Sequence, residues 1–284
     1  MSALPFVKMQ GVGNDFVVVD AGAWPEREDW PARAIVLCDR RTGIGGDGLL
    51  VVGPSAVADV RMRMFNPDGT EDMCGNGLRC VVRFAHERGF LGTEGVAETR
   101  AGLRRVSVLG PDTFAADMGA PRFAPADLPM RVDGPGPVLD FPLTLEGGET
   151  LPVSVVSTGT THTVVFVERL PEDADFFRLS PRIELHPLFP ERTSVLWTLV
   201  EGPDSQATVA RLRLRIWERG AGETLGCGTG ACAAAVLARM QNKASAPEID
   251  VLSRGGTLRV AWAGGADDTI LLTGPAEVVY TGRL

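Results

Sequence analysis

The sequence predicts an α+β fold in which strands dominate and a few helices lie buried among them. Three observations carry this prediction. Short runs rich in Val, Leu and Thr recur between Gly, Pro and Asp residues. Two apolar segments of helical length each follow a Cys-Gly-x-Gly element, and the second half of the chain repeats the order of the first. With 284 residues, the chain can bury a large core in one domain or two.

The strand prediction rests on a set of short apolar runs that turn residues bound on both sides. They are FVVVD, LLVVG, VRMRMF, TVVFV, RLRLRIW, TLRVAWA and TILLTG. Two of them, VRMRMF and RLRLRIW, alternate strictly between apolar and charged residues. That alternation predicts strands with one buried face.

Helical signals are fewer than strand signals. In DWPARAIVLCDR, Asp29 is a candidate N-cap and Pro31 falls in the first turn. The segment SPRIELHPLF predicts a helix that begins in the same way, at Ser180. Two further helices are expected near Asn76–Gly89 and Gly228–Gln241, directly after the cysteine-glycine elements.

The two halves resemble each other in order and spacing. VRMRMFNPDGTEDMCGNG parallels LRLRIWERGAGETLGCGTG, and GNDFVVV echoes GTTHTVVFV earlier in each half. We therefore expect two similar domains that face each other across an active-site cleft. The Pro-rich segment Met118–Pro129 is a natural linker, and the last strand, after Ala266, is expected to return to the first half. This gives a first domain of residues 1–123 plus 266–284 and a second of 124–265.

Composition excludes several classes of function. The chain is 44% hydrophobic and 23% charged with a net charge of −8, so we expect no nucleic-acid or anionic-membrane partner. The opening MSALPFVKMQ lacks the pattern of a signal peptide, and no apolar run reaches membrane-spanning length. We therefore expect a cytoplasmic protein. Its five cysteines are an odd number and do not form a disulfide framework.

Two elements, CGNGLRC at Cys74–Cys80 and CGTGAC at Cys227–Cys232, carry the candidate chemistry. A thiol at the first turn of a helix is expected to have a lowered pKa, because the unpaired N–H groups favour negative charge. The following glycines let the backbone approach a ligand and bind a carboxylate. Two thiols on opposite faces of one carbon could invert its configuration, one removing the α-proton and the other delivering a proton.

Other interpretations of these residues remain open. The four cysteines of the two elements could bind zinc, although their spacings miss the usual structural knuckle. Cys74 and Cys227 could form a disulfide on oxidation. The loop Gly43–Gly48, GIGGDG, could contact a phosphate but lacks the Lys-Ser/Thr ending of a P-loop. Cys38, Cys80 and Cys232 are most simply small core residues. A pyridoxal cofactor is disfavoured, because the two lysines, Lys8 and Lys243, have no suitable context.

The chain resembles the diaminopimelate epimerase family almost from end to end. The matching segments are KMQGVGNDFVVVD, CDRRTGIGGDGLL, NPDGTEDMCGNGLRC and WERGAGETLGCGTGACA. The resemblance implies two domains, each a barrel-like sheet around a central helix, the first carrying Cys74 and the second Cys227. It also implies a cofactor-independent isomerase of lysine and cell-wall synthesis with a small amino-acid substrate, and it suggests a homodimer and no bound metal.

The resemblance also assigns roles to residues. Cys74 and Cys227 would be the acid and base thiols, and His162 and Glu218 would assist them. The remaining residues would bind substrate: Asn14, Asn66, Gly75, Asn76, Thr160, Ser194, Glu218, Arg219, Gly228 and Thr229. Among these, Arg219 suits a bidentate contact with a carboxylate.

The chain departs from the family at two of these positions. Thr160 and Ser194 stand where the family has asparagines that help to bind the far, non-reacting end of diaminopimelate. Each hydroxyl is shorter than an amide and makes fewer hydrogen bonds. A second hypothesis therefore keeps the chemistry but changes the substrate to another α-amino acid. A third is a zinc- or ligand-binding protein without catalysis.

Overall fold

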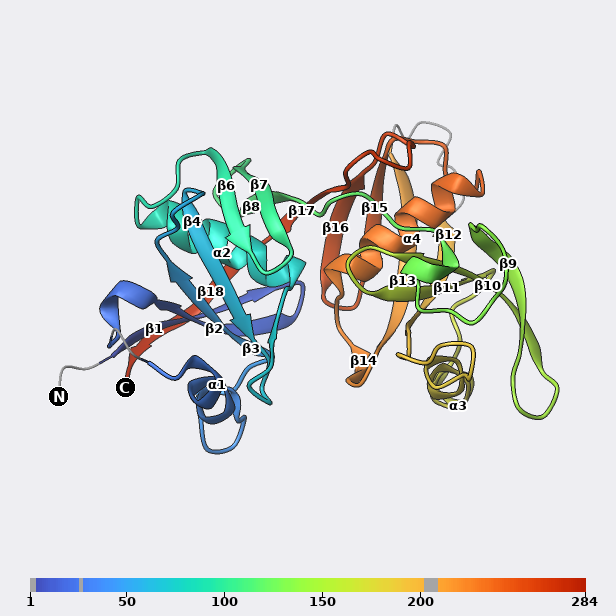
Figure 1. Ribbon diagram of the computed structural model, residues 1–284, viewed down its shortest axis with the longest axis horizontal. Helices are drawn as coiled ribbons and strands as arrows, with labels where there is room; N and C mark the ends of the chain where they lie inside the picture. Colours follow the sequence, from blue (N-terminus) through green and yellow to red (C-terminus); the bar gives the residue numbers. More distant parts are fainter. Residues whose placement is uncertain (1–3, 26–27, 202–208) are drawn as a thin grey trace. The chain divides into compact units, whose positions relative to one another are not determined.

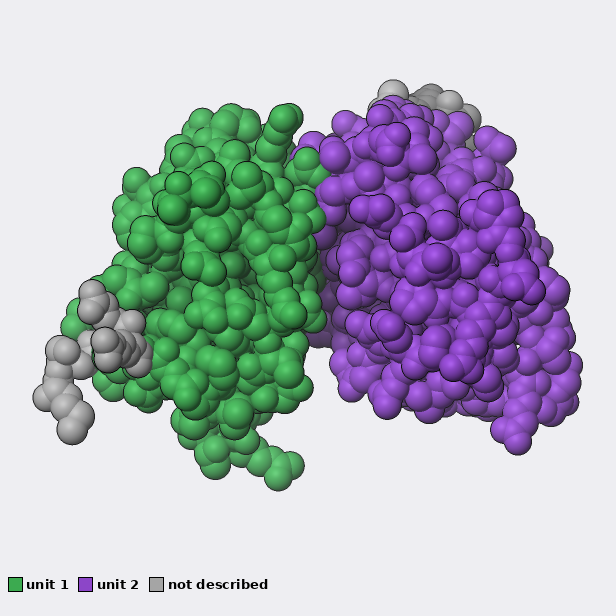
Figure 2. Space-filling model, in the orientation of Figure 1, with its two compact units in different colours: residues 1–117, 273–284 green, residues 118–272 purple. Residues whose placement is uncertain are grey.

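The computed structural model describes residues 4–25, 28–201 and 209–284, which form two compact units (Figures 1 and 2). Unit 1 comprises Met1–Asp117 and Thr273–Leu284, and unit 2 comprises Met118–Leu272. Strands dominate both units, and the four α-helices of the described residues lie among them, so the α+β prediction is confirmed.

In unit 1 the helices are α1 (Trp30–Cys38) and α2 (Gly75–Glu87), and the strands are β1 (Pro5–Gly11), β2 (Asn14–Asp20), β3 (Gly48–Gly53), β4 (Val60–Phe65), β5 (Glu71–Asp72), β6 (Glu94–Thr99), β7 (Gly102–Val108), β8 (Thr113–Asp117) and β18 (Glu277–Arg283). In unit 2 they are α3 (Asp173–Glu184), α4 (Gly228–Met240), β9 (Val138–Thr144), β10 (Thr150–Ser157), β11 (Thr161–Val167), β12 (Ser194–Glu201), β13 (Ala210–Glu218), β14 (Gly222–Thr224), β15 (Glu248–Ser253) and β16 (Gly256–Ala261). Strand β17 (Leu271–Pro275) carries the chain from unit 2 back to unit 1, where β18 pairs antiparallel with β1, as expected.

The two units repeat one strand pattern. In unit 1, β2 pairs parallel with β3, β3 antiparallel with β4, and β4 antiparallel with β5 and parallel with β6. In unit 2, β11 pairs parallel with β12, β12 antiparallel with β13, and β13 antiparallel with β14 and parallel with β15. Each unit adds an antiparallel partner at the far side, β7 on β6 and β16 on β15. The internal repeat seen in the sequence is therefore a repeat of topology.

One helix of each unit is enclosed by strands. Helix α2 contacts strands β1 to β4, β7 and β8, and α4 contacts β10 to β13, β15 and β16. Both helices occupy the segments that the sequence predicts. Helix α4 is apolar all round, and its residues from Ala231 to Ala238 are buried. The small alanine side chains let the surrounding strands approach the helix closely on several sides.

The other helix of each unit packs on the opposite face of the sheet. In unit 1, Trp30, Ala34 and Leu37 of α1 form a core cluster with alternate residues of β2 and β3, among them Val17 and Leu49. The alternating residue Leu50 of β3 points to α2, where its side chain would touch a Cβ added at Gly77. Both faces of these strands are buried, which explains their continuous apolar sequence. Helix α3 forms the corresponding cluster in unit 2.

Helix α1 begins as predicted, whereas α3 does not. The Asp29 side chain accepts a hydrogen bond from the Ala32 N–H, and Pro31 lies in the first turn. Helix α3 begins at Asp173, so Pro181 lies inside it rather than near its start. The Ser180 hydroxyl is not a cap; it accepts a hydrogen bond from Trp197 Nε1 at 2.9 Å. The prediction of a helix start at Ser180 is therefore wrong.

The physical reason is the apolar face of α3. Phe176, Leu179 and Ile183 lie on one side of the helix and are buried in the unit 2 core. Their packing outweighs the main-chain hydrogen bond that Pro181 cannot donate within the helix.

The segment Met118–Pro129, expected as a linker, belongs to unit 2. Arg122 and Ser157 exchange main-chain hydrogen bonds of 2.8 and 3.0 Å, and Leu128 lies in the core cluster of that unit. None of the described helices has the length and apolar character needed to cross a membrane.

Candidate active site

Each unit presents a cysteine at the N-terminus of its enclosed helix. Cys74 is the N-cap of α2 and Cys227 the N-cap of α4, both with extended backbone angles. Gly75 and Gly228 are the first residues of these helices, so the expected cysteine-glycine element opens a helix in both units. The first-turn N–H groups of a helix have no partner within it and favour an anion.

In unit 1 the Cys74 thiol lies beside an amide. Its Sγ donates to Asn14 Oδ1 at 3.4 Å, and Asn76 Nδ2 reaches the same oxygen at 3.5 Å. Asn76 is held in turn by the buried Arg79, whose Nη2 donates to Asn76 Oδ1 at 2.8 Å. Three of the predicted residues, Asn14, Cys74 and Asn76, are thus brought together.

A charged cluster binds the NH2 end of the Asn14 amide, the end that does not contact Cys74. Asn14 Nδ2 donates to Asp47 Oδ2 at 2.6 Å, and Arg40 pairs with both Asp47 and Asp15. Burial alone would raise the pKa of Asp15, but hydrogen bonds from Arg40 and Lys8 outweigh it and hold that pKa at about 2. Asp47 of the Gly43–Gly48 loop thus contacts Asn14, one of the predicted site residues.

Asn66 lies in the turn between β4 and β5. Its N–H donates to the Thr70 carbonyl at 2.8 Å and its Nδ2 to Thr70 Oγ1 at 3.0 Å. These bonds shape the turn that leads, through β5, to Cys74.

In unit 2 the Cys227 thiol is almost fully buried. Its Sγ accepts the Gly230 N–H at 3.3 Å and lies 3.4 Å from Thr229 Oγ1. Burial raises the pKa of the thiol well above its usual value, and the nearby Glu218 carboxylate raises it further. The hydrogen bonds from Thr229 and Gly230 lower the pKa but do not compensate. The expectation of a lowered pKa is therefore wrong at Cys227, because desolvation outweighs the helix N-terminus.

The acidic partner of Cys227 comes from the β13–β14 hairpin. Glu218 ends β13, and its Oε1 accepts the Thr224 hydroxyl at 2.6 Å from β14. The next residue, Arg219, donates its N–H to Ser194 Oγ at 3.1 Å and its Nη1 to the Glu191 carbonyl at 3.1 Å.

His162 is a buried neutral imidazole. Burial, and secondarily the charge of Arg219, lower the pKa of His162 to about 3. Its Nε2 lies 3.1 Å from Thr160 Oγ1. Its Nδ1 is buried and has no hydrogen-bond partner among the described residues. A buried polar atom of this kind is suited to a ligand.

The two departures from the family pattern use their hydroxyls within the protein. Thr160 Oγ1 contacts His162, and Ser194 Oγ accepts from the Arg219 main chain. A contact that sequence reasoning missed lies close by, where Thr158 Oγ1 donates to the Thr229 carbonyl at 2.8 Å. This bond ties the turn before β11 to the first turn of α4.

A second feature that sequence reasoning missed is an Arg–Glu pair in each unit. Arg63 of β4 binds Glu71 of β5 through two hydrogen bonds of 2.8 Å, and Arg215 of β13 binds Glu223 of β14 at 2.9 Å. In each pair the arginine and the glutamate are eight positions apart in the sequence, and the two pairs lie at matching positions of the internal repeat. Each pair holds the short strand that precedes a cysteine, β5 before Cys74 and β14 before Cys227. The repeated spacing was the signal that could have revealed them.

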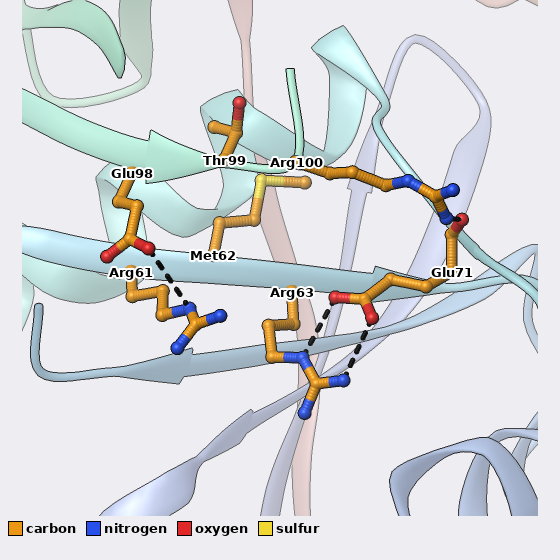
Figure 3. A pocket seen from close by; sticks show the side chains of 7 residues that line it. All are labelled: Arg61, Met62, Arg63, Glu71, Glu98, Thr99 and Arg100. Atoms are coloured by element: carbon orange, nitrogen blue, oxygen red, sulfur yellow. Dashed lines mark hydrogen bonds and ion pairs between the residues drawn. The ribbon is translucent and has the colours of Figure 1, made fainter. Parts of the chain in front are cut away.

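The unit 1 pair also lines a small surface cavity with Arg61, Met62, Glu98, Thr99 and Arg100 (Figure 3). There Arg61 pairs with Glu98 and Arg100 donates to the Glu71 carbonyl, so the charged side chains largely satisfy one another.

The remaining cysteines are buried, as expected of core residues. Burial raises the pKa of Cys38 to about 11 and that of Cys80 to about 12, so both are thiols at neutral pH. Over the described ranges, no three His, Cys, Asp or Glu side chains are grouped to hold a metal ion.

Comparisons with known proteins indicate the family of the chain. The family model for diaminopimelate epimerase matches residues 6–124 and 154–279. The chain is 44% identical to a diaminopimelate epimerase of Desulforudis audaxviator, covering 99% of both chains. It is 42% identical to one from Desulfitobacterium hafniense, covering 99% of this chain and 98% of that one.

Solved structures share the fold at low identity. A PhzF-family phenazine biosynthesis protein of Bacillus anthracis matches with a TM-score of 0.67 at 21% identity, covering 100% of this chain and 99% of that one. A probable proline racemase of Agrobacterium radiobacter matches with a TM-score of 0.68 at 16% identity, covering 99% and 92%. The family matches extend over almost the whole chain and include both cysteine-glycine elements. The chain therefore belongs to the diaminopimelate epimerase family.

Proposed function

We propose that this protein is a diaminopimelate epimerase that interconverts the LL and meso forms without a cofactor. The observation that carries the proposal is the thiol at the glycine-rich start of a helix in each unit, with Glu218 near Cys227 and a buried, neutral His162 in the same unit. Family membership with 44% identity over nearly the whole chain supports the substrate. We further propose that it acts in the cytoplasm as a homodimer.

The reaction we propose moves one proton off the α-carbon and another onto it. One thiolate takes the α-proton, so a C–H bond breaks and an S–H bond forms. The other thiol donates its proton to the opposite face of the carbon, which inverts the configuration. The enzyme is left with the two protonation states exchanged, ready for the reverse reaction.

The surroundings of Cys227 suit the proton-donor state of this cycle. Burial and Glu218 favour its thiol form, so Cys227 holds a proton at neutral pH. Donation leaves a thiolate that the Gly230 N–H and the Thr229 hydroxyl can bind. His162, neutral because its pKa is about 3, can bind the substrate or relay a proton without adding charge.

The protein's own residues must supply the stabilisation that a pyridoxal ring provides elsewhere. Lys8 is buried and paired with Asp15 at 2.5 Å, and the Lys243 ammonium lies over the Phe166 ring. Neither lysine is placed for a Schiff base. We propose that the first-turn N–H groups of α2 and α4 bind the substrate carboxylate, and that Arg219 binds a carboxylate of the substrate.

A related substrate is the second candidate, because of Thr160 and Ser194. In place of two long amides, this chain has two hydroxyls that are already hydrogen-bonded to His162 and to the Arg219 main chain. A pocket with fewer polar groups for the far amino-acid end could prefer another α-amino acid.

Deuterium exchange distinguishes the two candidates. Reduced enzyme is incubated in D2O with LL-diaminopimelate and, separately, with a panel of other α-amino acids. We expect deuterium at Cα and loss of optical purity with diaminopimelate alone. Exchange with another amino acid, while diaminopimelate stays inert, would establish the second candidate. An enzyme inert toward the whole panel would contradict both.

A further inference from the structure

Asp47 contacts the unit 1 site but had no role in the prediction of that site. The parallel register of β2 and β3 pairs Phe16 with Gly48, which places Asp47 beside the start of β2. Its Oδ2 accepts Asn14 Nδ2 at 2.6 Å and the Asp15 N–H at 3.1 Å. Its own N–H donates to the Asp15 carbonyl at 2.7 Å, and its Oδ1 pairs with Arg40 at 2.8 Å. The carboxylate is therefore fixed by three contacts, and the main chain of Asp47 by a fourth.

These contacts determine which end of the Asn14 amide faces the thiol. A carboxylate only accepts hydrogen bonds, so the NH2 end of Asn14 must face Asp47. The oxygen end then faces Cys74 Sγ at 3.4 Å and Asn76 Nδ2 at 3.5 Å. An amide oxygen accepts from a thiol S–H but repels a thiolate. Rotated by half a turn, the same amide would offer an N–H to the sulfur and would favour the thiolate instead.

We propose that Asp47 is a positioning residue for Cys74: it locks the Asn14 amide with its oxygen toward Sγ and so favours the protonated thiol. The inference rests on the proposed function, in which Cys74 exchanges a proton with substrate. It extends that function, because the equilibrium between thiol and thiolate at Cys74 is then set by a residue that contacts neither the substrate nor the sulfur.

Other charged groups near this site are common to every variant considered below. Lys8 of β1, Asp15 of β2 and Arg40 after α1 surround Asp47, and Arg79 of α2 holds Asn76. Asp47→Asn also removes the charge at position 47, so the part of the shift that the amide orientation causes is the part that an Asn14→Ala background abolishes.

The test measures the pH dependence of alkylation of Cys74 by iodoacetamide. The background is Cys227→Ser, in which the other cysteines, Cys38, Cys80 and Cys232, are buried. Replacing Asp47 by Asn keeps the size of the side chain but offers both a donor and an acceptor, so the Asn14 amide is free to turn. We expect the midpoint pH of alkylation to fall by about half a unit or more.

Two comparisons separate positioning from a general loss of structure. In an Asn14→Ala background, Asp47→Asn should cause a clearly smaller shift, because the amide through which Asp47 acts is gone and only the change of charge remains. The matched control is Asp39→Asn at the end of α1, since among the described residues Asp39 binds the Arg41 and Thr42 N–H groups rather than Asn14. Its midpoint should equal that of the parent, and urea unfolding verifies that each variant is folded.

An unchanged midpoint in folded Asp47→Asn would overturn the proposal, as would an equal shift in the Asn14→Ala background. If Asp47→Asn does not fold, Asn14→Ala alone decides, because loss of the acceptor oxygen must also lower the midpoint. Alkylation needs no turnover. An enzyme inert toward amino acids would therefore contradict the proposed function and leave the test of Asp47 intact.

Discussion

The buried imidazole of His162 should make the protein sensitive to acid. Burial, and then the charge of Arg219, lower its pKa from 6.5 to about 3. Between these values the unfolded chain binds a proton at this position and the folded chain does not. The free energy of unfolding therefore falls as the pH decreases through this window, and the contribution is fully present only above pH 6.5.

The size of the effect follows from the two pKa values. Between pH 8 and pH 5 they give a loss of about 2 kcal/mol from this one residue. His162→Gln removes the titrating group and keeps an amide that can bond to Thr160. Urea unfolding of both proteins between pH 8 and pH 5 measures the difference. We expect the wild type to lose about 2 kcal/mol more stability than His162→Gln over this range.

A second variant tests the cause of the shift. Arg219→Met removes the smaller of the two causes and leaves the burial of His162, so the pKa of His162 should stay well below 5 and most of the excess loss relative to His162→Gln should persist between pH 8 and pH 5. Parallel stability curves for wild type and His162→Gln would refute the conclusion that His162 is buried as a neutral ring.

Three further predictions concern the surroundings of the thiols. Gly230→Ala adds a Cβ 2.9 Å from Leu196 Cδ2 and 3.3 Å from Cys227 Sγ. It should therefore lower the free energy of unfolding in urea by about 1–3 kcal/mol and slow epimerisation. Full activity would contradict the close packing. Arg79→Met leaves Asn76 Oδ1 and two main-chain carbonyls without this donor, and should cost about 1–3 kcal/mol. A neutral result in thermal unfolding would show that the arginine is not needed there. Arg63→Met removes the partner of Glu71 in a part-exposed ion pair, so we expect the free energy of unfolding to fall by only about 1 kcal/mol. We also expect a lower turnover rate, and unchanged turnover would count against a role of Arg63 in holding the strand before Cys74.

Much of the fold follows from local sequence patterns. Helix α1 carries its own start signal in Asp29 and Pro31, and the glycines after Cys74 and Cys227 mark the starts of α2 and α4. The strict alternation in β4 and β13 gives their buried faces directly. The topological repeat is visible because the alternating strand, the polar turn and the cysteine recur in the same order.

The errors arise where distant contacts outweigh a local signal. Ser180 and Pro181 have the sequence of a helix start, but burial of Phe176, Leu179 and Ile183 extends α3 through them. That burial depends on the sheet beneath the helix, which no local pattern describes.

The chemistry of the site was predictable only in part. The sequence indicates which residues are reactive, and the structure brings Asn14 to Cys74 and Glu218 to Cys227. It does not indicate how far each thiol is buried, so the raised pKa of Cys227 could not be foreseen. The Asn14–Asp47 bond joins residues 33 positions apart through the pairing of β2 and β3, and its role is likewise visible only in three dimensions.

The central claim is that two different thiols remove and deliver the α-proton. The most direct test follows the epimerisation of LL-diaminopimelate in D2O at low conversion. The product and the recovered substrate are separated, and the deuterium content of each is measured by mass spectrometry. Two thiols predict one deuterium at Cα of each product molecule and almost none in the recovered substrate, with product formation lost in Cys74→Ser and in Cys227→Ser. Product that retains the original proton, or full epimerisation by either single variant, would contradict the account.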